Sequence, residues 1–331
     1  MCQIRSIILI AMTVFLLSCQ QADVDTHETR FMMGTLVSFT VTHADKTLAK
    51  KAIRKAAEEM QRVESIFTIY GDQPNDIKAF NQSPINTGIH FTPEISKLLK
   101  TALMIERQSL GSFNPKLALL NKLWGFSQTI AVEHPPSQQA IEKYLHGTQR
   151  CLQQQAKQWF RSTSNCQLDF GAIAKGYAID RGIAVLRQYD IQNAMINAGG
   201  DMRLIGKHGS KDWRIGIRDP RHKDEIIATL SLHGDVSIVT SGDYERYFMY
   251  QGQRYHHILE PKTGWVSRHS QSTTVIAANA MLADAWSTAL FVAGKKGIKL
   301  AEKYGLQALI IDSEGHQYTT KDMPINLLSK P

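Results

Sequence analysis

The stretch from Asn279 to Phe291, NAMLADAWSTALF, restricts what this chain can fold into and what it can bind more than any other stretch. It follows a largely apolar run, residues 273–278, that predicts a buried strand. Its content of Ala, Leu and Met predicts a helix. Asp284 and Thr288 are spaced i, i+4, so their side chains lie on one face of that helix.

A carboxylate and a hydroxyl on one face of an apolar helix admit two interpretations. They suit a hard cation such as Mg²⁺, which takes few protein ligands and completes its shell with water and phosphate. Alternatively, Asp284 is a buried carboxylate that accepts hydrogen bonds from backbone amides, and Thr288 donates back to the carbonyl one turn earlier. The helix by itself favours the second interpretation.

Composition and charge indicate an ordinary globular protein. The 331 residues suffice for a sizeable core in one large or two ordinary domains, and 21% of them are charged. The formal charge is +8, but the basic residues are scattered, without an arginine-rich run or an interleaved aromatic platform. The densest basic group, within residues 46–62, lies on the polar face of an amphipathic helix, where solvation explains it. We therefore expect no nucleic-acid partner.

The N-terminus indicates export. Residues 7–17 form an apolar run of signal-peptide length, behind the single basic residue Arg5, and too short to span a bilayer comfortably. The run ends in Leu16-Leu17-Ser18-Cys19, which resembles the lipobox of bacterial lipoproteins. The resemblance implies cleavage before Cys19, a lipid on its sulfur, and a periplasmic-facing protein anchored to a membrane. An ordinary secretory signal or a short membrane anchor is the alternative.

Two cysteines remain once Cys2 leaves with the signal and Cys19 carries the lipid. Cys151 and Cys166 then lie in an oxidising compartment, where pairing is possible. The alternating run at residues 155–161 between them predicts one strand of a hairpin. A disulfide across this hairpin and a pair of free thiols are both open.

Helices and strands are mixed along the rest of the chain. Amphipathic spacing predicts a helix over residues 45–67, and a second from Pro93, capped by Thr92, to about Gly111. Without strict βαβ alternation, the pattern favours an α+β fold over a doubly wound sheet. The expected units are a signal peptide (1–18), a lipidated tether (19–29) and a single domain (30–325). Expected strands include 30–42, 194–206, 213–218, 225–232, 237–240, 244–250, 253–259, 308–312 and 316–319.

Several turns contain glycine, and basic residues lie near them in the sequence. Glycine lets backbone amides come close to a ligand, and strand-to-helix turns offer free N–H groups to phosphate. None is a G-x-G-x-x-G fingerprint or a Walker loop, and each alone is an ordinary turn. Together with Lys175, Arg246 and His257 they predict a site for a large phosphorylated ligand. The turns are Met33-Gly34-Thr35, 169–176, 197–201, 240–243 and 261–264.

The order of these motifs resembles that of a known family. The motifs are MGT at residues 33–35, DFGAIAKGY at 169–177, NAGG at 197–200, TSGDYERY at 240–247, HILEPKTG at 257–264 and AMLADA at 280–285. In this order, over about residues 30–319, the chain closely resembles the ApbE family of FAD:protein FMN transferases. The resemblance implies a mixed α+β fold in which antiparallel and mixed sheets are flanked by helices.

The resemblance also implies a reaction. Such enzymes bind FAD and Mg²⁺, cleave the pyrophosphate, and move FMN onto a Thr or Ser hydroxyl of a target protein while AMP leaves. The targets would be flavin-accepting subunits of membrane redox complexes. Two alternatives use the same features: an FAD pyrophosphatase that passes FMN to water, and a periplasmic lipoprotein that only binds flavin.

Site residues follow from the resemblance by motif position. It implies Mg²⁺ ligands at Asp284, Thr288 and the main-chain carbonyl of Ala172. His257 is the candidate for handling the acceptor proton or contacting the phosphate, and a satisfied strand histidine is the alternative. The implied flavin contacts are Met33, Tyr70, Ser112, Phe113, Asn114, Asp169, Lys175 and Ile258.

Three positions depart from the pattern of the relatives. Ser287 stands where some carry a carboxylate, which leaves a fourth metal ligand open. Asn114 replaces an Asp in the turn after the second helix, so a charge is missing there although hydrogen bonding is retained. Glu260 replaces an Asp before Pro261, which keeps the charge with a longer reach.

Overall fold

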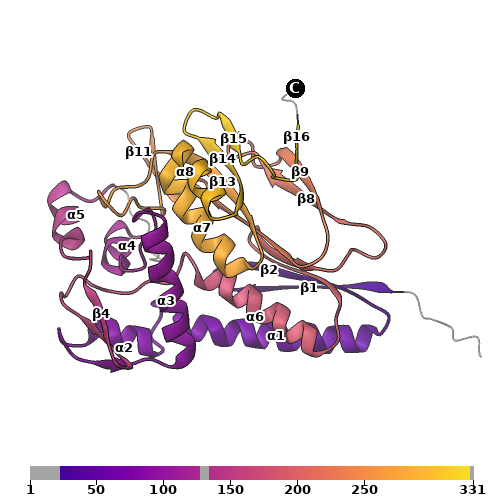
Figure 1. Cartoon of the computed structure of the whole chain (residues 1–331), viewed down its shortest axis with the longest axis horizontal. Coiled ribbons are helices and arrows are strands. Elements are labelled where there is room, and N and C mark those ends of the chain that lie inside the picture. The colour runs from indigo at the N-terminus through magenta and orange to yellow at the C-terminus, as the bar shows by residue number, and fades with distance from the viewer. Residues whose placement is uncertain (1–22, 127–133, 329–331) are drawn as a thin grey trace, which may run out of the picture.

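An eight-stranded antiparallel sheet forms the centre of the fold in the computed structural model, which describes residues 23–126 and 134–328 (Figure 1). Its strand order is β1-β2-β6-β7-β10-β13-β14-β15, and every neighbouring pair is antiparallel. The predicted α+β class is confirmed. The strands are β1 (Val24–Met32), β2 (Thr35–His43), β6 (Asn193–Ala198), β7 (Asp201–Ile205), β10 (Val236–Gly242), β13 (Ser270–Ala277), β14 (Gln307–Asp312) and β15 (Gln317–Thr319).

Both faces of this sheet are covered, because successive side chains of a strand point to opposite faces. Val239 and Val275 belong to the core beneath the helices, whereas the adjacent Ile238 and Ile276 belong to a second core beneath a small sheet. The helices on the first face are α1 (Lys46–Phe67), α6 (Ala174–Gln188), α7 (Ala280–Ala293) and α8 (Gly297–Lys303), with the short 3₁₀ turn η1 (Gly294–Lys296). The small sheet on the other face consists of β8 (Trp213–Arg218), β9 (Ile226–Leu232) and β16 (Ile325–Leu327).

The remaining elements lie beside the large sheet, on the left in Figure 1. Trp124 is fully buried there, and its indole N–H donates to the Gly264 carbonyl at 2.9 Å. Tyr255 and Trp265 pack against it, so this part of the chain has an aromatic core of its own. The elements are α2 (Asp76–Gln82), β3 (Ile89–His90), α3 (Pro93–Gln108), α4 (Ala118–Trp124), α5 (Gln138–Leu145), β4 (Leu152–Gln155), β5 (Gln158–Arg161), β11 (Tyr247–Tyr250) and β12 (Gln253–His256).

Two expected strands are hairpins: residues 30–42, expected as one strand, and residues 194–206, expected as a strand interrupted by Gly199-Gly200. Met33 and Gly34 have φ values of 54° and 70°, so the chain reverses there in a tight two-residue turn. Gly199 and Gly200, at 64° and 102°, reverse it between β6 and β7. As a consequence β1 begins at Val24, and residues 24–29, expected as part of a polar tether, pair with β2 instead.

The helix signals were more reliable than the strand boundaries. The Thr92 side chain caps α3, as predicted. The Asp45 side chain, expected as the first residue of its helix, caps α1 by accepting from the amides of Thr47 and Leu48. Helix α2 was missed, although the Asn75 side chain caps it. Its length of 7 residues is too short for the apolar spacing to show a clear helical period.

The structure contains a disulfide between the two remaining cysteines, a point that the sequence left open. Cys151 and Cys166 are bonded, with 5.9 Å between their Cα atoms, and the β4–β5 hairpin runs between them. Cys19 and the expected signal peptide lie outside the described residues. Within the described ranges, no helix is both long and apolar enough to cross a bilayer.

Candidate active site

Where helices α6 and α7 cross, each provides a carboxylate that accepts hydrogen bonds from backbone amides in the first turn of the other. Asp284 of α7 accepts, through Oδ2, a hydrogen bond from the Gly176 amide in the first turn of α6 at 2.9 Å. Asp180 of α6 accepts from the amides of Ala280 and Met281 at the start of α7, at 2.8 and 3.0 Å. The first amides of a helix have no partner within it, and the helix dipole favours a carboxylate there. Each helix therefore holds the N-terminus of the other.

Gly176 makes this close approach possible. A Cβ atom added at Gly176 would lie 2.1 Å from the Ala280 carbonyl oxygen and 2.8 Å from Asp284 Cβ. Both distances are shorter than any tolerated contact, so a side chain here would push α7 away from α6. The glycine in the motif at residues 169–177 is thus explained by packing rather than by a turn.

Burial and a neighbouring carboxylate make the ionised form of Asp284 energetically unfavourable. Only 5% of the residue is exposed. Burial and, to a smaller degree, the nearby Asp201 carboxylate raise the pKa of Asp284 to about 7, against the opposing effects of Lys175 and the Gly176 amide. A bound cation would relieve this cost, because it would offset the repulsion and replace the lost solvation.

The hydroxyl groups near Asp284 do not make the hydrogen bonds that a purely structural role of this helix predicts. Ser287, not Thr288, donates to the carbonyl of Asp284, at 2.8 Å. The Thr288 hydroxyl is partly exposed and lies 3.4 Å from Ser241 Oγ, which in turn lies 2.7 Å from Ser287 Oγ. The purely structural interpretation of this helix required two things: that Asp284 accept from a backbone amide, and that Thr288 donate to the carbonyl one turn earlier. The first is observed, whereas Ser287 donates to that carbonyl in place of Thr288.

The donor set fits a hard cation. The Gly176 amide would ordinarily donate to the carbonyl of Ala172, one turn earlier, but it is committed to Asp284. The Ala172 carbonyl is therefore left without this bond, and with the Asp284 carboxylate and the Thr288 hydroxyl it would offer oxygen atoms of the kind that Mg²⁺ takes. Ala172 lies in the turn just before α6, and the other two residues lie on one face of α7, which packs against α6.

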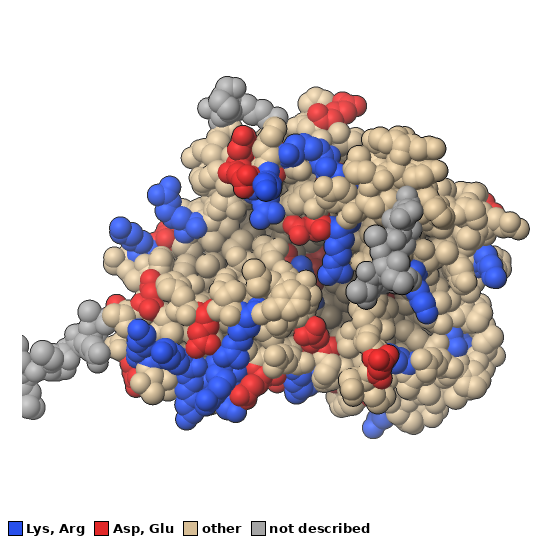
Figure 2. All heavy atoms as spheres, turned by 180° about the vertical axis from the view of Figure 1, so that it is seen from behind, with Lys and Arg blue, Asp and Glu red and all other residues tan. Residues whose placement is uncertain are grey.

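Lys175 supplies a fixed positive charge beside the carboxylates. Its Nζ lies 2.8 Å from Oδ2 of Asp201, which is 1% exposed. Burial lowers the pKa of Lys175, but the carboxylates of Asp201 and Asp284 outweigh it and hold the pKa above its usual value. Lys175 is therefore charged at neutral pH. Near the middle of the face in Figure 2, acidic and basic side chains lie next to one another around a hollow.

His257 is a neutral histidine with a buried, unused ring nitrogen. Its Nδ1 is shielded from solvent and has no hydrogen-bond partner among the described residues. Burial and, to a smaller degree, the neighbouring His256 and Arg246 lower the pKa of His257 to about 3. The structure therefore does not match the satisfied strand histidine that was the alternative.

Arg246 lies between the histidine and the first hairpin. Its carbonyl accepts from the His257 amide at 3.1 Å, and a Cβ atom at Gly34 would lie 3.5 Å from its Nη2. Arg246 also lines a pocket of about 260 Å³ together with Trp124, Phe126 and Phe248. The motifs at residues 33–35, 240–247 and 257–264, far apart in the sequence, thus meet at one place.

Asp169 joins the turn after α3 to this region. Its carboxylate accepts from the Asn121 side chain at 2.7 Å and the Gly171 amide at 2.8 Å, and its amide donates to the Pro115 carbonyl at 2.9 Å. The expected flavin contacts Ser112, Phe113 and Asn114 lie in that turn; Phe113 is buried, and Asn114 Oδ1 accepts from the Lys116 amide.

The other expected flavin contacts are more scattered. Met33 lies in the first hairpin turn, where its amide donates to Glu64 at 3.0 Å. Tyr70, 42% exposed, follows the end of α1, where Phe67 packs on Phe170 and Tyr177. Ile258 is buried against Phe291 and Val292, and both its amide and its carbonyl are bonded within the protein. Contact of these residues with flavin stays a prediction.

The sequence assigned no role to three polar residues that assemble the site. Asp201 anchors Lys175, Asp180 caps α7, and Ser241 joins the hydroxyls of Ser287 and Thr288. Asp201 and Ser241 lie within the glycine-bearing turns at 197–201 and 240–243, which pointed to the region but not to these side chains. Asp180 offers no such signal, because its partners are amides distant in the sequence.

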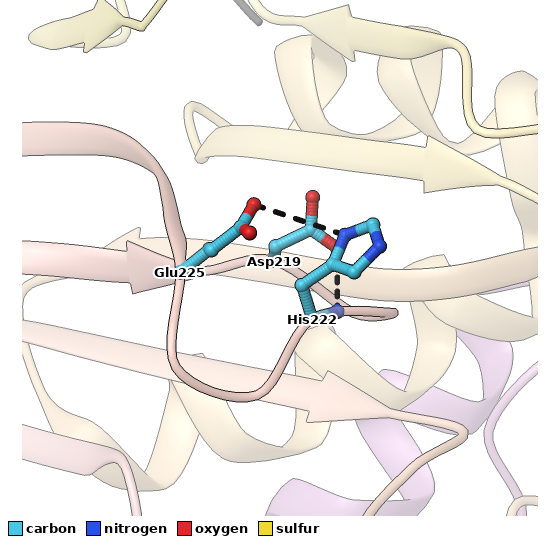
Figure 3. A group of neighbouring side chains, drawn as sticks. All are labelled: Asp219, His222 and Glu225. Atoms are coloured by element: carbon cyan, nitrogen blue, oxygen red, sulfur yellow. Dashed lines mark hydrogen bonds and ion pairs between the residues drawn. The ribbon is translucent and has the colours of Figure 1, made fainter. Parts of the chain in front are cut away.

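A second group of possible metal ligands lies between β8 and β9. Asp219, His222 and Glu225 each place one ligand atom within 4.8 Å of the others (Figure 3). However, the Asp219 carboxylate already accepts from the amides of Arg221 and His222, at 2.7 and 3.1 Å. These contacts close the loop, and the two remaining side chains are largely exposed.

The fold and the site define a mixed α+β protein in which buried carboxylates, hydroxyl groups and the Lys175 ammonium group lie close together where α6, α7 and the large sheet meet. The chain belongs to the ApbE family, whose model matches residues 33–310. The solved ApbE protein of Thermotoga maritima superposes with a TM-score of 0.83 at 34% identity, over 90% of this chain and 97% of that one.

Named relatives agree with this assignment. The FAD:protein FMN transferase of Rhodobacter capsulatus is 30% identical over 308 residues, which are 92% of this chain but only 58% of that relative. The FAD:protein FMN transferase of Haemophilus influenzae is 29% identical in an alignment 333 residues long, gaps included, which covers 96% of this chain and 95% of that relative. The match to the second extends over almost the full length of both proteins.

Proposed function

We propose that this protein transfers FMN from FAD to a Thr or Ser hydroxyl of a target protein, in a Mg²⁺-dependent reaction that releases AMP. The coarser statement, a flavin transferase of the ApbE family, follows from the family match and the named relatives. The observation that supports the finer proposal is the proximity of the Lys175 ammonium group to both the Asp284 carboxylate and the His257 ring, each of which it affects electrostatically.

The chain's own residues suit a displacement at phosphorus. Lys175 and Arg246 would bind the pyrophosphate and offset the negative charge that develops as AMP leaves. The Asp284 carboxylate, the Thr288 hydroxyl and the Ala172 carbonyl would hold Mg²⁺, which when bound supplies Lewis-acid stabilisation of the phosphoryl oxygens.

His257 is proposed to accept the proton of the acceptor hydroxyl. A neutral imidazole contributes no positive charge to a phosphate, but its free ring nitrogen accepts a proton or a hydrogen bond. A bound pyrophosphate would also raise the low pKa of His257, because a nearby anion favours the charged imidazole. Of the two roles considered for this residue, proton transfer therefore fits better than contact with the phosphate.

The address and the partner are proposed from the sequence. A lipid on Cys19 would tether the protein to a bacterial membrane, facing the periplasm. A disulfide between Cys151 and Cys166 is compatible with that oxidising compartment. The flavin-accepting subunit of a membrane redox complex would then be within reach of the cleft.

Incubation with FAD, Mg²⁺ and an acceptor domain tests the reaction. In-gel flavin fluorescence on the acceptor, with AMP released in equal amount, is the expected result. Free FMN and AMP without labelling would indicate an FAD pyrophosphatase, and FAD binding without any AMP would indicate a flavin-binding protein. Either of these two results would overturn the proposal.

A further inference from the structure

We infer that Asp201 is a positioning residue that fixes the ammonium group of Lys175 at the reaction site; the inference rests on the proposed transfer of FMN. Asp201 is the first residue of β7, and its buried carboxylate is the ion-pair partner of Lys175, at 2.8 Å. It lies on neither of the two helices that provide the expected metal ligands.

The backbone of the large sheet fixes the position of this carboxylate. The Thr240 amide of the neighbouring strand β10 donates to Asp201. The turn before it is held by the Gly199 amide, which donates to the Leu36 carbonyl at 3.2 Å, and by the Gly200 amide, which donates to Asn197 Oδ1 at 2.9 Å. A Cβ atom at Gly199 would lie 2.5 Å from Thr35 Oγ1, so the turn has no room to shift.

Lys175, by contrast, has a flexible side chain that needs an anchor. A lysine carries a compact charge on four rotatable carbons, and 32% of this side chain is exposed. Of the other two carboxylates that act on its charge, Asp284 uses Oδ2 to accept from the Gly176 amide, and Glu245 has a smaller effect than either aspartate. Asp201 is therefore the group that decides where Nζ lies.

Position matters because the charge acts mainly in the transition state. Attraction between Lys175 and a bound pyrophosphate needs only an ammonium group nearby. Stabilising the charge that develops at the departing oxygen needs it at a defined point, and misplacement by about 1 Å can cost about 100-fold in rate. A residue that only braced α6 against β7 would instead act through the stability of the fold.

A double-mutant cycle separates these roles. In Asp201→Asn, which keeps the shape and an acceptor for the Thr240 amide, we expect kcat for AMP release to fall about 10- to 100-fold. The Kd for FAD, measured by quenching of flavin fluorescence, should change less than about threefold, because Lys175 keeps its charge. In a Lys175→Met background, the same Asn substitution should cause no further loss of kcat.

A matched control removes a carboxylate outside the site. Asp235 pairs with Arg187 and Arg203 at the surface, so Asp235→Asn makes the same chemical change away from the cleft and should leave kcat unchanged. An equal loss of kcat from Asp201→Asn in both backgrounds would show that Asp201 acts independently of Lys175, and would overturn the inference. So would an unchanged kcat, or a loss confined to FAD affinity.

A second measurement does not depend on turnover. Acetylation of Lys175 by N-hydroxysuccinimidyl acetate, read by mass spectrometry against the exposed Lys50, should be faster in Asp201→Asn because Nζ loses its partner. An unchanged acetylation rate would overturn the inference even if the wild type proved not to transfer FMN. If Asp201→Asn does not fold, Asp201→Glu, which displaces the carboxylate, should also give faster acetylation and lower kcat; wild-type values for both would contradict the inference.

Discussion

Helices α1 and α7 pack on the same face of the large sheet but place their polar residues in opposite environments. The buried residues of α1 are all apolar, and charged residues such as Lys50, Lys51 and Glu58 are exposed. In α7, Asp284 and Ser287 are buried among Ala, Leu and Phe. Polar groups on α1 are solvated at little cost, whereas those on α7 are desolvated and must be compensated.

The comparison teaches where function is to be sought. A helix such as α1, whose polar stripe faces water, is fully explained by the fold. A helix that buries a carboxylate with a pKa raised to about 7 is not, because an apolar residue would pack there at lower cost. Each prediction below changes a residue on one of these helices, or on α6, which packs against both.

The largest expected effect comes from removing the buried carboxylate. Asp284→Ala should lower kcat for AMP release by about 1000-fold or more, because it removes the one anionic ligand expected for the metal. Mg²⁺ should raise the Tm of the wild type but not of this variant. Glu58→Gln, which removes a carboxylate from the exposed face of α1, is the control and should retain full turnover. Turnover retained by Asp284→Ala would contradict the proposal that the buried carboxylate of α7 takes part in the reaction.

The next effect tests the crossing of α6 and α7. Gly176→Ala should lower the free energy of unfolding by about 2–3 kcal/mol, because its Cβ would clash with the backbone of α7. Urea denaturation measures the change. Gly182→Ala on the same helix should cost less, since its nearest atoms, Ile196 Cδ1 and Met60 Sδ, end flexible side chains that can move. Equal losses for both variants would contradict the account of Gly176.

A smaller effect concerns the ion pairs of α1. Hydrogen bonds from Arg62 lower the pKa of Glu59 to about 2, against the opposing effect of burial, and Arg181 of α6 adds to the lowering. Because the folded-state pKa is depressed, the stabilisation is present above the unfolded pKa of about 4.5 and is lost as the pH falls through about 2.

The measurement compares Glu59→Gln with the wild type at two pH values. Discounted for partial exposure of the arginines, the wild type should be more stable by about 1–2 kcal/mol at pH 7. Urea denaturation at pH 2 should show a much smaller difference, since Glu59 is then half protonated. A difference that does not shrink with falling pH would show that the ion pairs contribute little.

The same contrast explains how much the sequence predicts. Helix α1 is predicted almost to the residue, because its apolar spacing and the Asp45 cap are local features. The hairpin at Met33-Gly34 is predicted only in part: the glycine indicates a turn, but alternation continues across it, so residues 24–29 are not recognised as part of a separate strand. Motif order indicates Asp284 and Lys175, but the Asp201–Lys175 pair depends on strand order in the sheet, which local sequence does not specify.

The smallest expected effect lies on the solvated face of α1. Lys50 is exposed, so Lys50→Ala should change the free energy of unfolding by less than about 0.5 kcal/mol, with the helix propensity of Ala offsetting any loss. Turnover should be unchanged.

Removing a polar group from α7 by Thr288→Val should instead lower turnover while leaving the fold intact, because the hydroxyl is expected to bind the metal and is not part of the apolar core. A loss of activity in Lys50→Ala comparable to that in Thr288→Val would mean that the exposed face of α1 also takes part in the reaction, for example in binding the acceptor protein.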